Sequence, residues 1–172
     1  MAKRGNKTGQ FYLVAAIIIA GIAIGLVAVA NYSKKQEQTE INSLKEEIQI
    51  ESSMVLDHAL NTGESQQETS NLMQDFTQIY IDSESRDKNL YFIFGRQSNI
   101  ILKGYQKNAH NVLLNGNQIT SSSGEFSGST NSGSSVVLQI DEDQHTFELG
   151  GGENFYFIIS QEASGGDYVV VG

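Results

Sequence analysis

The sequence predicts an α+β protein: an N-terminal transmembrane helix extended into a helical stalk, followed by a C-terminal antiparallel β-sandwich-like domain. Residues 11–32 are apolar and uncharged, and the next stretch spaces its apolar residues as a helix does. From about residue 88 the apolar residues alternate, as in strands. The expected parts are a cytoplasmic basic leader (1–10), a transmembrane helix (11–32), a helical stalk with a second helix (33–87) and an extracytoplasmic β-domain (88–172).

The apolar run at residues 11–30 contains no charged residue and no proline. In a helix, about 20 residues cover the roughly 30 Å of a bilayer core. We therefore expect one span, with the lipid bilayer as its partner. A buried helix of a soluble protein is the alternative, but no other segment is apolar enough to cover it.

The charges that flank this run predict its orientation. Lys3, Arg4 and Lys7 precede it, whereas only Lys34 and Lys35 follow directly, which favours a cytoplasmic N-terminus. All 20 acidic residues lie beyond residue 35 with six of the basic ones, so that part carries a net charge of −14. We expect a single-pass cell-membrane protein with its C-terminal domain outside.

Three fates of the N-terminus are open from the residues alone. In the first, the helix is kept uncut as an anchor. In the second, signal peptidase cuts at Ala28-Val29-Ala30 and releases the domain, and in the third a prepilin-type peptidase cuts behind Gly9, before the apolar run. The signal-peptide reading fits less well, because the apolar run is longer than the usual signal core.

The segment KTGQFYL at residues 7–13, followed by a long Ile/Ala/Val run, resembles the leader of archaeal type IV pilin-like proteins. It is also similar to a group of small, uncharacterised archaeal membrane-anchored surface proteins. In pilins the leader is cut on the cytoplasmic side and the apolar helix is kept. The resemblance therefore implies processing between Gly9 and Gln10, and possible location in a pilus.

The sequence departs from the pilin pattern at two positions. Thr8 stands where archaeal leaders carry Lys or Arg, and Val14 stands where bacterial pilins carry an assembly glutamate. A cut after Gly5 would fit the basic-glycine pattern better, but the polar Asn6 and Lys7 would then follow it.

Gly21 and Gly25 form a G-x-x-x-G pattern inside the apolar run. Small residues four apart let two helix backbones approach closely, so this pair predicts self-association through the helix. The alternative is that both are ordinary members of a helix type in which Gly and Ala are common.

The stalk is expected to end at Asn61-Thr62-Gly63, where glycine interrupts the helical pattern. Ser65 and Glu68 then have the spacing of a capping box that starts a second helix. One face of that helix is expected to carry Leu72, Met73, Phe76, Ile79 and Tyr80.

About seven short strands are expected after residue 88, at sandwich-like spacing. They include a hairpin at Asn115-Gly116 and two similar core strands, NLYFIF (89–94) and NFYFII (154–159). The Ser/Gly-rich stretch 121–135 is expected to be an exposed, mobile loop.

Few residues suggest chemistry. The chain has no cysteine, and its three histidines lack the spacing of a zinc site. Asp141 and Asp143 are weak calcium candidates, because the surrounding acidic segment lacks the glycine and final glutamate of an EF-hand loop. A solvated hairpin turn is the favoured interpretation of this segment. No catalytic residue and no cofactor are predicted, and the acidic charge argues against nucleic acid.

Two functions from different classes follow. The first is a cell-surface type IV pilin-like subunit, with the apolar helix for assembly and the β-domain exposed for adhesion to an unknown surface ligand. The second is a membrane-anchored extracytoplasmic binding or envelope protein that does not polymerise. An enzyme whose site is assembled from separate loops is a weaker third hypothesis, since no catalytic motif is present.

Overall fold

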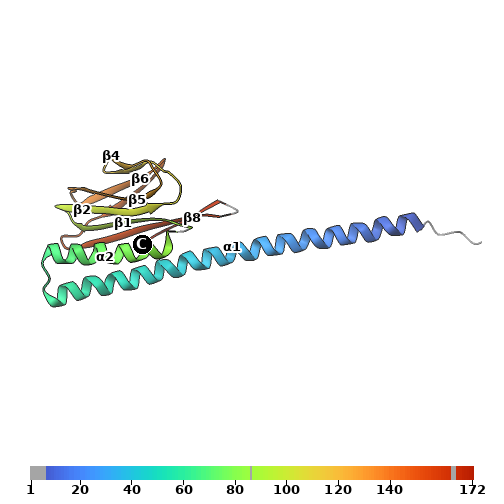
Figure 1. Cartoon of the computed structure of the whole chain (residues 1–172), viewed down its shortest axis with the longest axis horizontal. Coiled ribbons are helices and arrows are strands. Elements are labelled where there is room, and N and C mark those ends of the chain that lie inside the picture. The colour runs from blue at the N-terminus through green and yellow to red at the C-terminus, as the bar shows by residue number, and fades with distance from the viewer. Residues whose placement is uncertain (1–6, 86, 164–165) are drawn as a thin grey trace, which may run out of the picture. The chain divides into compact units, whose positions relative to one another are not determined.

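The computed structural model describes the backbone of residues 7–85, 87–163 and 166–172. Within these ranges it leaves aside the side chains of residues 7–17, 30, 33–34, 162–163 and 166–167. The chain divides into two compact units, Met1–Thr39 and Glu40–Gly172. Helix α1 (Lys7–Thr62) contributes residues to both units, and all other elements belong to the second (Figure 1).

The membrane-spanning part of the predicted fold class is contradicted. A span needs about 20 consecutive apolar residues in one helix. Among the residues that the structure describes, no helix is both long enough and apolar enough to meet this requirement. This finding contradicts the predicted transmembrane helix at 11–32. It also contradicts the predicted single-pass location, with a cytoplasmic N-terminus and an extracytoplasmic C-terminal domain.

The second unit is α+β with two antiparallel sheets. The five-stranded sheet has the order β5-β2-β1-β8-β9, and the four-stranded sheet has the order β4-β3-β6-β7. The first sheet comprises β5 (Gly124–Thr130), β2 (Asn99–Gln106), β1 (Asn89–Arg96), β8 (Asn154–Ala163) and β9 (Gly166–Val171). The second comprises β4 (Asn117–Thr120), β3 (Val112–Leu114), β6 (Ser135–Ile140) and β7 (Asp143–Glu148).

Local chemistry sets the start of helix α2 (Gln66–Glu84) and the end of helix α1. The side chain of Ser65 accepts a hydrogen bond from the Glu68 backbone N–H, and the Glu68 carboxylate accepts one from the Ser65 N–H. This confirms the capping box. Helix α1 ends at Thr62, and Gly63 follows with φ +70°, a conformation that glycine adopts without strain.

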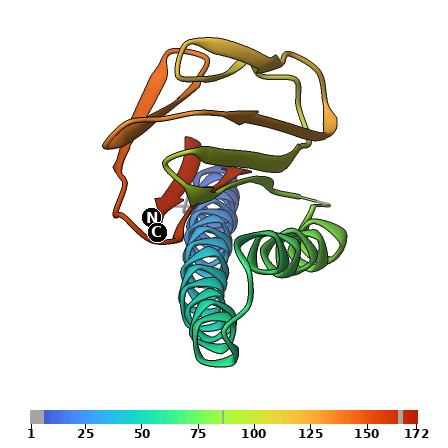
Figure 2. The same ribbon diagram turned by 90° about the vertical axis from the view of Figure 1, so that its left-hand side faces the viewer.

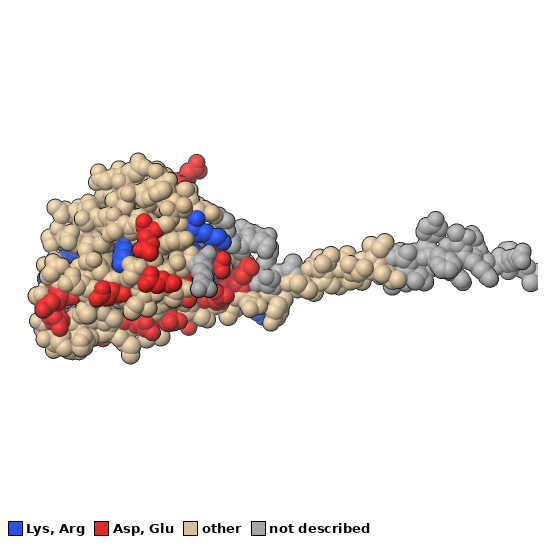
Figure 3. Space-filling model, in the orientation of Figure 1, with Lys and Arg blue, Asp and Glu red and all other residues tan. Residues whose placement is uncertain are grey.

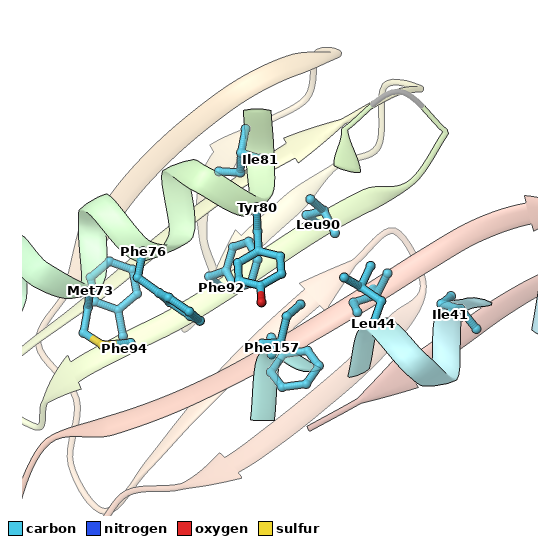
Figure 4. Packing of buried hydrophobic residues seen from close by; sticks show 12 residues of the cluster. Ile41, Leu44, Met73, Phe76, Tyr80, Ile81, Leu90, Phe92, Phe94 and Phe157 are labelled. Atoms are coloured by element: carbon cyan, nitrogen blue, oxygen red, sulfur yellow. The ribbon is translucent and has the colours of Figure 1, made fainter. Parts of the chain in front are cut away.

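Unit 2 has three layers, which are seen end-on in Figure 2. Helix α2 and the part of α1 from residue 40 onward cover one face of the five-stranded sheet, and the four-stranded sheet covers the other face. Phe92, Phe94 and Phe157 point toward the helices, where they meet Leu44 and Phe76 (Figure 4). Because both sides are covered, β1 is buried over almost its whole length.

The two similar strands NLYFIF and NFYFII are β1 and β8, and they pair antiparallel in the middle of the larger sheet. Phe92 lies opposite Phe157, and Leu90 lies opposite Ile159. The alternate residues Tyr91, Ile93 and Ile158 face the second sheet instead. The prediction of two core strands built alike is confirmed.

Helix α2 differs from its prediction at one side of its buried face. Met73, Phe76 and Tyr80 are buried as expected, but Ile79 is 65% exposed and Ile81 takes its place in the core. The helix is therefore rotated about its own axis relative to the prediction, so that residues 73, 76, 77, 80 and 81 are buried.

The Ser/Gly-rich stretch is not the expected loop, because residues 124–130 form strand β5. This strand pairs with β2 from Gly124 opposite Gln106 to Thr130 opposite Ile100. Its glycines allow close packing, since a Cβ on Gly128 would lie 2.6 Å from the Ile119 side chain. Backbone pairing and close approach here override a composition that is typical of a loop.

The hairpin at Asn115-Gly116 is confirmed, with a two-residue turn between β3 and β4. Both residues have positive φ, 50° and 78°, as a type I′ turn requires. The Asn115 side chain also accepts a hydrogen bond from the Val137 N–H, which ties the turn to β6.

Candidate functional site

Two features outside the packed core are candidates for function. The first, which we call the apolar helix segment, is residues 18–29 of α1. Every side chain in it is exposed, and the large ones are between 56% and 70% exposed. These large residues are Ile18, Ile19, Ile22, Ile24, Leu26, Val27 and Val29. Exposed apolar area of this extent usually marks a surface that another molecule covers.

The apolar helix segment has one shallow side. Residues four apart lie on the same face of a helix, so the segment can be described as rows along its axis. The rows that start at residues 18, 19 and 20 each contain at least one isoleucine. The row that starts at residue 21 contains Gly21, Gly25 and Val29. A Cβ added to either glycine would meet nothing within 4 Å.

The predicted processing residues Gly9 and Gln10 fall within the bounds of α1. They belong to the part of the helix whose side chains lie outside the described residues. Cleavage between them stays a prediction.

The second feature is a cavity of about 110 Å³ at one end of the sandwich, which we call the end cavity. Strands β1, β8 and β9 of the larger sheet line one side, and the β6–β7 hairpin and the β2–β3 connection line the other. Its polar lining residues are Asn89, Tyr91, His110, Asp141, Asp143, His145 and Ser160.

Asp141 is held in place at the mouth of the end cavity. It lies in the β6–β7 turn with φ 52°, and its two carboxylate oxygens accept hydrogen bonds from the Asn111 N–H and from His110 Nδ1, each at 2.8 Å. The backbone hydrogen bond from Asn111, followed by that from His110, lowers the pKa of Asp141. This carboxylate is therefore ionised at neutral pH and fixes the position of the His110 ring.

Tyr91 forms part of the inner wall of the end cavity. Its side chain is 1% exposed, and its hydroxyl has no hydrogen-bond partner among the residues that the structure describes. Burial, and then the negative charge of Asp141, raises the pKa of this hydroxyl. It is therefore a protonated donor at any physiological pH, and an unpartnered buried donor is costly enough to need a reason.

The two calcium candidates border the same cavity. Asp141 and Asp143 both line the end cavity, together with His110 and His145. Within the described part of the chain, however, no three His, Asp or Glu side chains are grouped closely enough to hold a metal ion. The two aspartates border a hairpin turn, and the nearest ring nitrogen is already bonded to Asp141.

Acidic side chains dominate the face of unit 2 shown in Figure 3, where they gather over the helical layer. Lys88 lies in the connection before β1, is buried, and bonds to two of the helices' acidic residues. Its Nζ lies 2.9 Å from carboxylate oxygens of both Glu40 and Glu84.

We compared the chain with protein-family models, with curated proteins and with solved structures, and none of them matches. The resemblance of the N-terminal segment to type IV pilin-like leaders therefore stays a prediction based on those residues.

Sequence reasoning did not find the end cavity. The acidic segment from Asp141 to His145 reads as one solvated turn, and the sequence gives no sign that His110 lies beside it. Tyr91 gave no signal either, because it lies in an apolar run whose other members are all core. The alternation of β1 was the one available clue, since it places Tyr91 on the face opposite Phe92.

Proposed function

We propose that this chain is a type IV pilin-like filament subunit, in which the apolar helix segments of several copies pack together and the β-domain faces outward for adhesion. The observation that carries the proposal is the exposure of residues 18–29 around the whole helix.

A helix that is apolar all round needs to be covered all round. One partner helix covers only one stripe, so a dimer packed on the glycine row would leave most of Ile19, Leu26 and Val27 in water. A bundle or filament core made of many copies covers every row. The row with Gly21 and Gly25 lets one neighbour approach more closely than the others, which favours a fixed packing angle.

Charge predicts how such an assembly responds to salt. The part of the chain beyond residue 35 carries −14, so neighbouring domains repel one another when they are brought together. Salt shortens the range of this repulsion to about 10 Å at 0.1 M. We therefore expect assembly to be weak at low ionic strength and to increase as salt is added.

Electron microscopy of filaments sheared from cells that produce the chain, with mass spectrometry of their subunits, tests the proposal. The double variant Gly21→Leu/Gly25→Leu should reduce assembly, because it fills the close-approach row. Ala23→Leu is the matched control, since it adds the same side chain in the row of Ile19 and Val27. We expect the control to assemble nearly as well as the unchanged protein.

Two results would count against a filament subunit. One is the absence of this chain from all purified filaments, together with a monomer in sedimentation at every salt concentration. The other is equal assembly of the glycine variant and its control. In either case a binding protein that does not polymerise is the better account. The mass of the mature chain adds an independent check, since prepilin-type processing predicts a first residue of Gln10.

A further inference from the structure

We propose that the end cavity is a binding site for a neutral ligand that carries hydroxyl groups, such as a single sugar unit of a saccharide. The proposal concerns the ligand of the β-domain and does not depend on filament assembly, so either one can fail without the other.

The inner wall of the cavity supplies hydrogen-bond donors. The hydroxyl of Tyr91 is buried, protonated and without a partner among the described residues. Ser160 Oγ accepts a hydrogen bond from Asn89 Nδ2 at 3.0 Å, which leaves its own hydrogen free to donate. A ligand that fits this wall must bring an acceptor oxygen, which an ammonium group lacks.

The mouth of the cavity supplies acceptors and negative charge. Asp141 is ionised, and each of its carboxylate oxygens already accepts a hydrogen bond from the β2–β3 connection. The Asp143 carboxylate makes no hydrogen bond to another described residue, is exposed, and borders the same cavity. Two carboxylates disfavour a carboxylate or phosphate ligand. Asp143 instead needs a ligand that can donate to it.

Hydroxyl groups meet both requirements, because each one can donate and accept. The remaining wall is apolar: Ile140, Ile158 and Val169 are the nonpolar residues that line the cavity. Such side chains suit the C–H groups of a sugar ring. The volume of about 110 Å³ exceeds that needed for a single water several-fold and suits one ring rather than an extended chain.

Saturation-transfer NMR on the full chain in a sugar-free detergent tests this inference. The probes are methyl α-mannoside, methyl β-galactoside and N-acetylglucosamine at millimolar concentrations, with methylammonium, acetate and zinc chloride as comparisons. We expect transfer to at least one of the sugars, and neither acetate nor methylammonium should displace it.

Tyr91→Phe and Asp143→Asn are the informative variants. Loss of one neutral hydrogen bond should weaken sugar binding by roughly two- to tenfold. Tyr91→Phe should leave the unfolding midpoint unchanged or raised, because the hydroxyl that it removes has no partner in the chain. Tyr105→Phe is the control, since Tyr105 packs against the helix-facing core on the other side of the sheet.

Three results would overturn the proposal. The first is no transfer to any of the sugars. The second is sugar binding that Tyr91→Phe and Tyr105→Phe leave equally intact. The third is tighter binding of methylammonium, acetate or zinc than of the sugars, which would assign the cavity to a different chemistry.

Discussion

Lys88 joins three elements of unit 2 and makes a quantitative prediction possible. It precedes β1 and bonds through Nζ to Glu40 of α1 and Glu84 of α2, both at 2.9 Å. The side chain of Lys88 is 5% exposed, whereas Glu40 is 58% and Glu84 33% exposed. The cation is thus buried while its partners reach water, so the two sides of this cluster should respond differently to mutation.

Removing the cation should be the milder change. Lys88→Met loses two hydrogen bonds to charged groups, worth about 1.5–3 kcal/mol each at most. Two effects offset part of this loss: the exposed carboxylates become hydrated, and folding no longer has to remove water from the ammonium group. We therefore expect the free energy of unfolding to fall by about 1–2 kcal/mol. The double variant Glu40→Ala/Glu84→Ala leaves a buried charge unpaired and should lose about 3–5 kcal/mol. Alanine keeps helix propensity high at both positions.

Urea unfolding of the full chain at pH 7 measures these differences. Far-UV circular dichroism is the suitable signal, because the protein has no tryptophan. Lys107→Met is the matched control: its 3.6 Å ion pair with Asp87 is exposed and should contribute below about 1 kcal/mol. If Lys88→Met proves as destabilising as the double alanine variant, the reasoning from unequal burial is refuted.

The pH dependence of this cluster has a definite sign. Burial by itself would lower the pKa of Lys88, but the hydrogen bonds that its ammonium donates to Glu40 and Glu84 outweigh burial and raise the pKa. A raised folded-state pKa means that the stabilisation is complete below the unfolded-state pKa of about 10.4. It is then lost as pH rises through the higher folded value. Lys88→Met should remove this alkaline loss.

Three further predictions concern single positions. Gly104→Ala should destabilise by about 1–3 kcal/mol, because its Cβ would lie 2.2 Å from a backbone oxygen of β1; Gly133→Ala, which meets nothing within 4 Å, should change urea midpoints little. Ser65→Ala should cost about 1 kcal/mol in the same assay through loss of the α2 cap. Hydrogen bonds, first from the Asn111 N–H, lower the pKa of Asp141, so its stabilisation is present above about pH 3.9 and lost as pH falls through the lower folded value. Asp141→Asn should therefore show a flatter acid limb in pH-dependent unfolding.

Local chemistry made parts of the fold predictable. Ser65, Asn115 and Gly63 act through their own backbone neighbours, so their cap, turn and helix end follow from short stretches of sequence. The alternation in β1 and β8 is equally local, and the period of two places Phe92 and Phe157 on the face that meets the helices.

The misplaced elements depend on partners that are distant in sequence. Strand β5 is built from residues that favour loops, and it forms because β2 offers an open edge beside Gly104. Ile81 replaces Ile79 in the core because the sheet, rather than the helix pattern, sets the rotation of α2. The end cavity combines residues of five strands and two connections, so no local pattern could indicate that His110 and Tyr91 lie together.

The pairing of β1 with β8 also has a consequence for synthesis of the chain. On the ribosome, β1 emerges well before its central partner β8, and non-local pairing of this kind is slow. In that interval the NLYFIF segment is a short, uncharged, strongly β-prone sequence without proline, which is the composition that drives aggregation. Strand β2, which follows directly, pairs with one edge of β1, but the other edge stays unpaired until β8 is made. We therefore expect the yield of folded protein in cells to depend on how quickly residues 154–159 are synthesised. A nascent chain that stalls before residue 154 should be the species that aggregates.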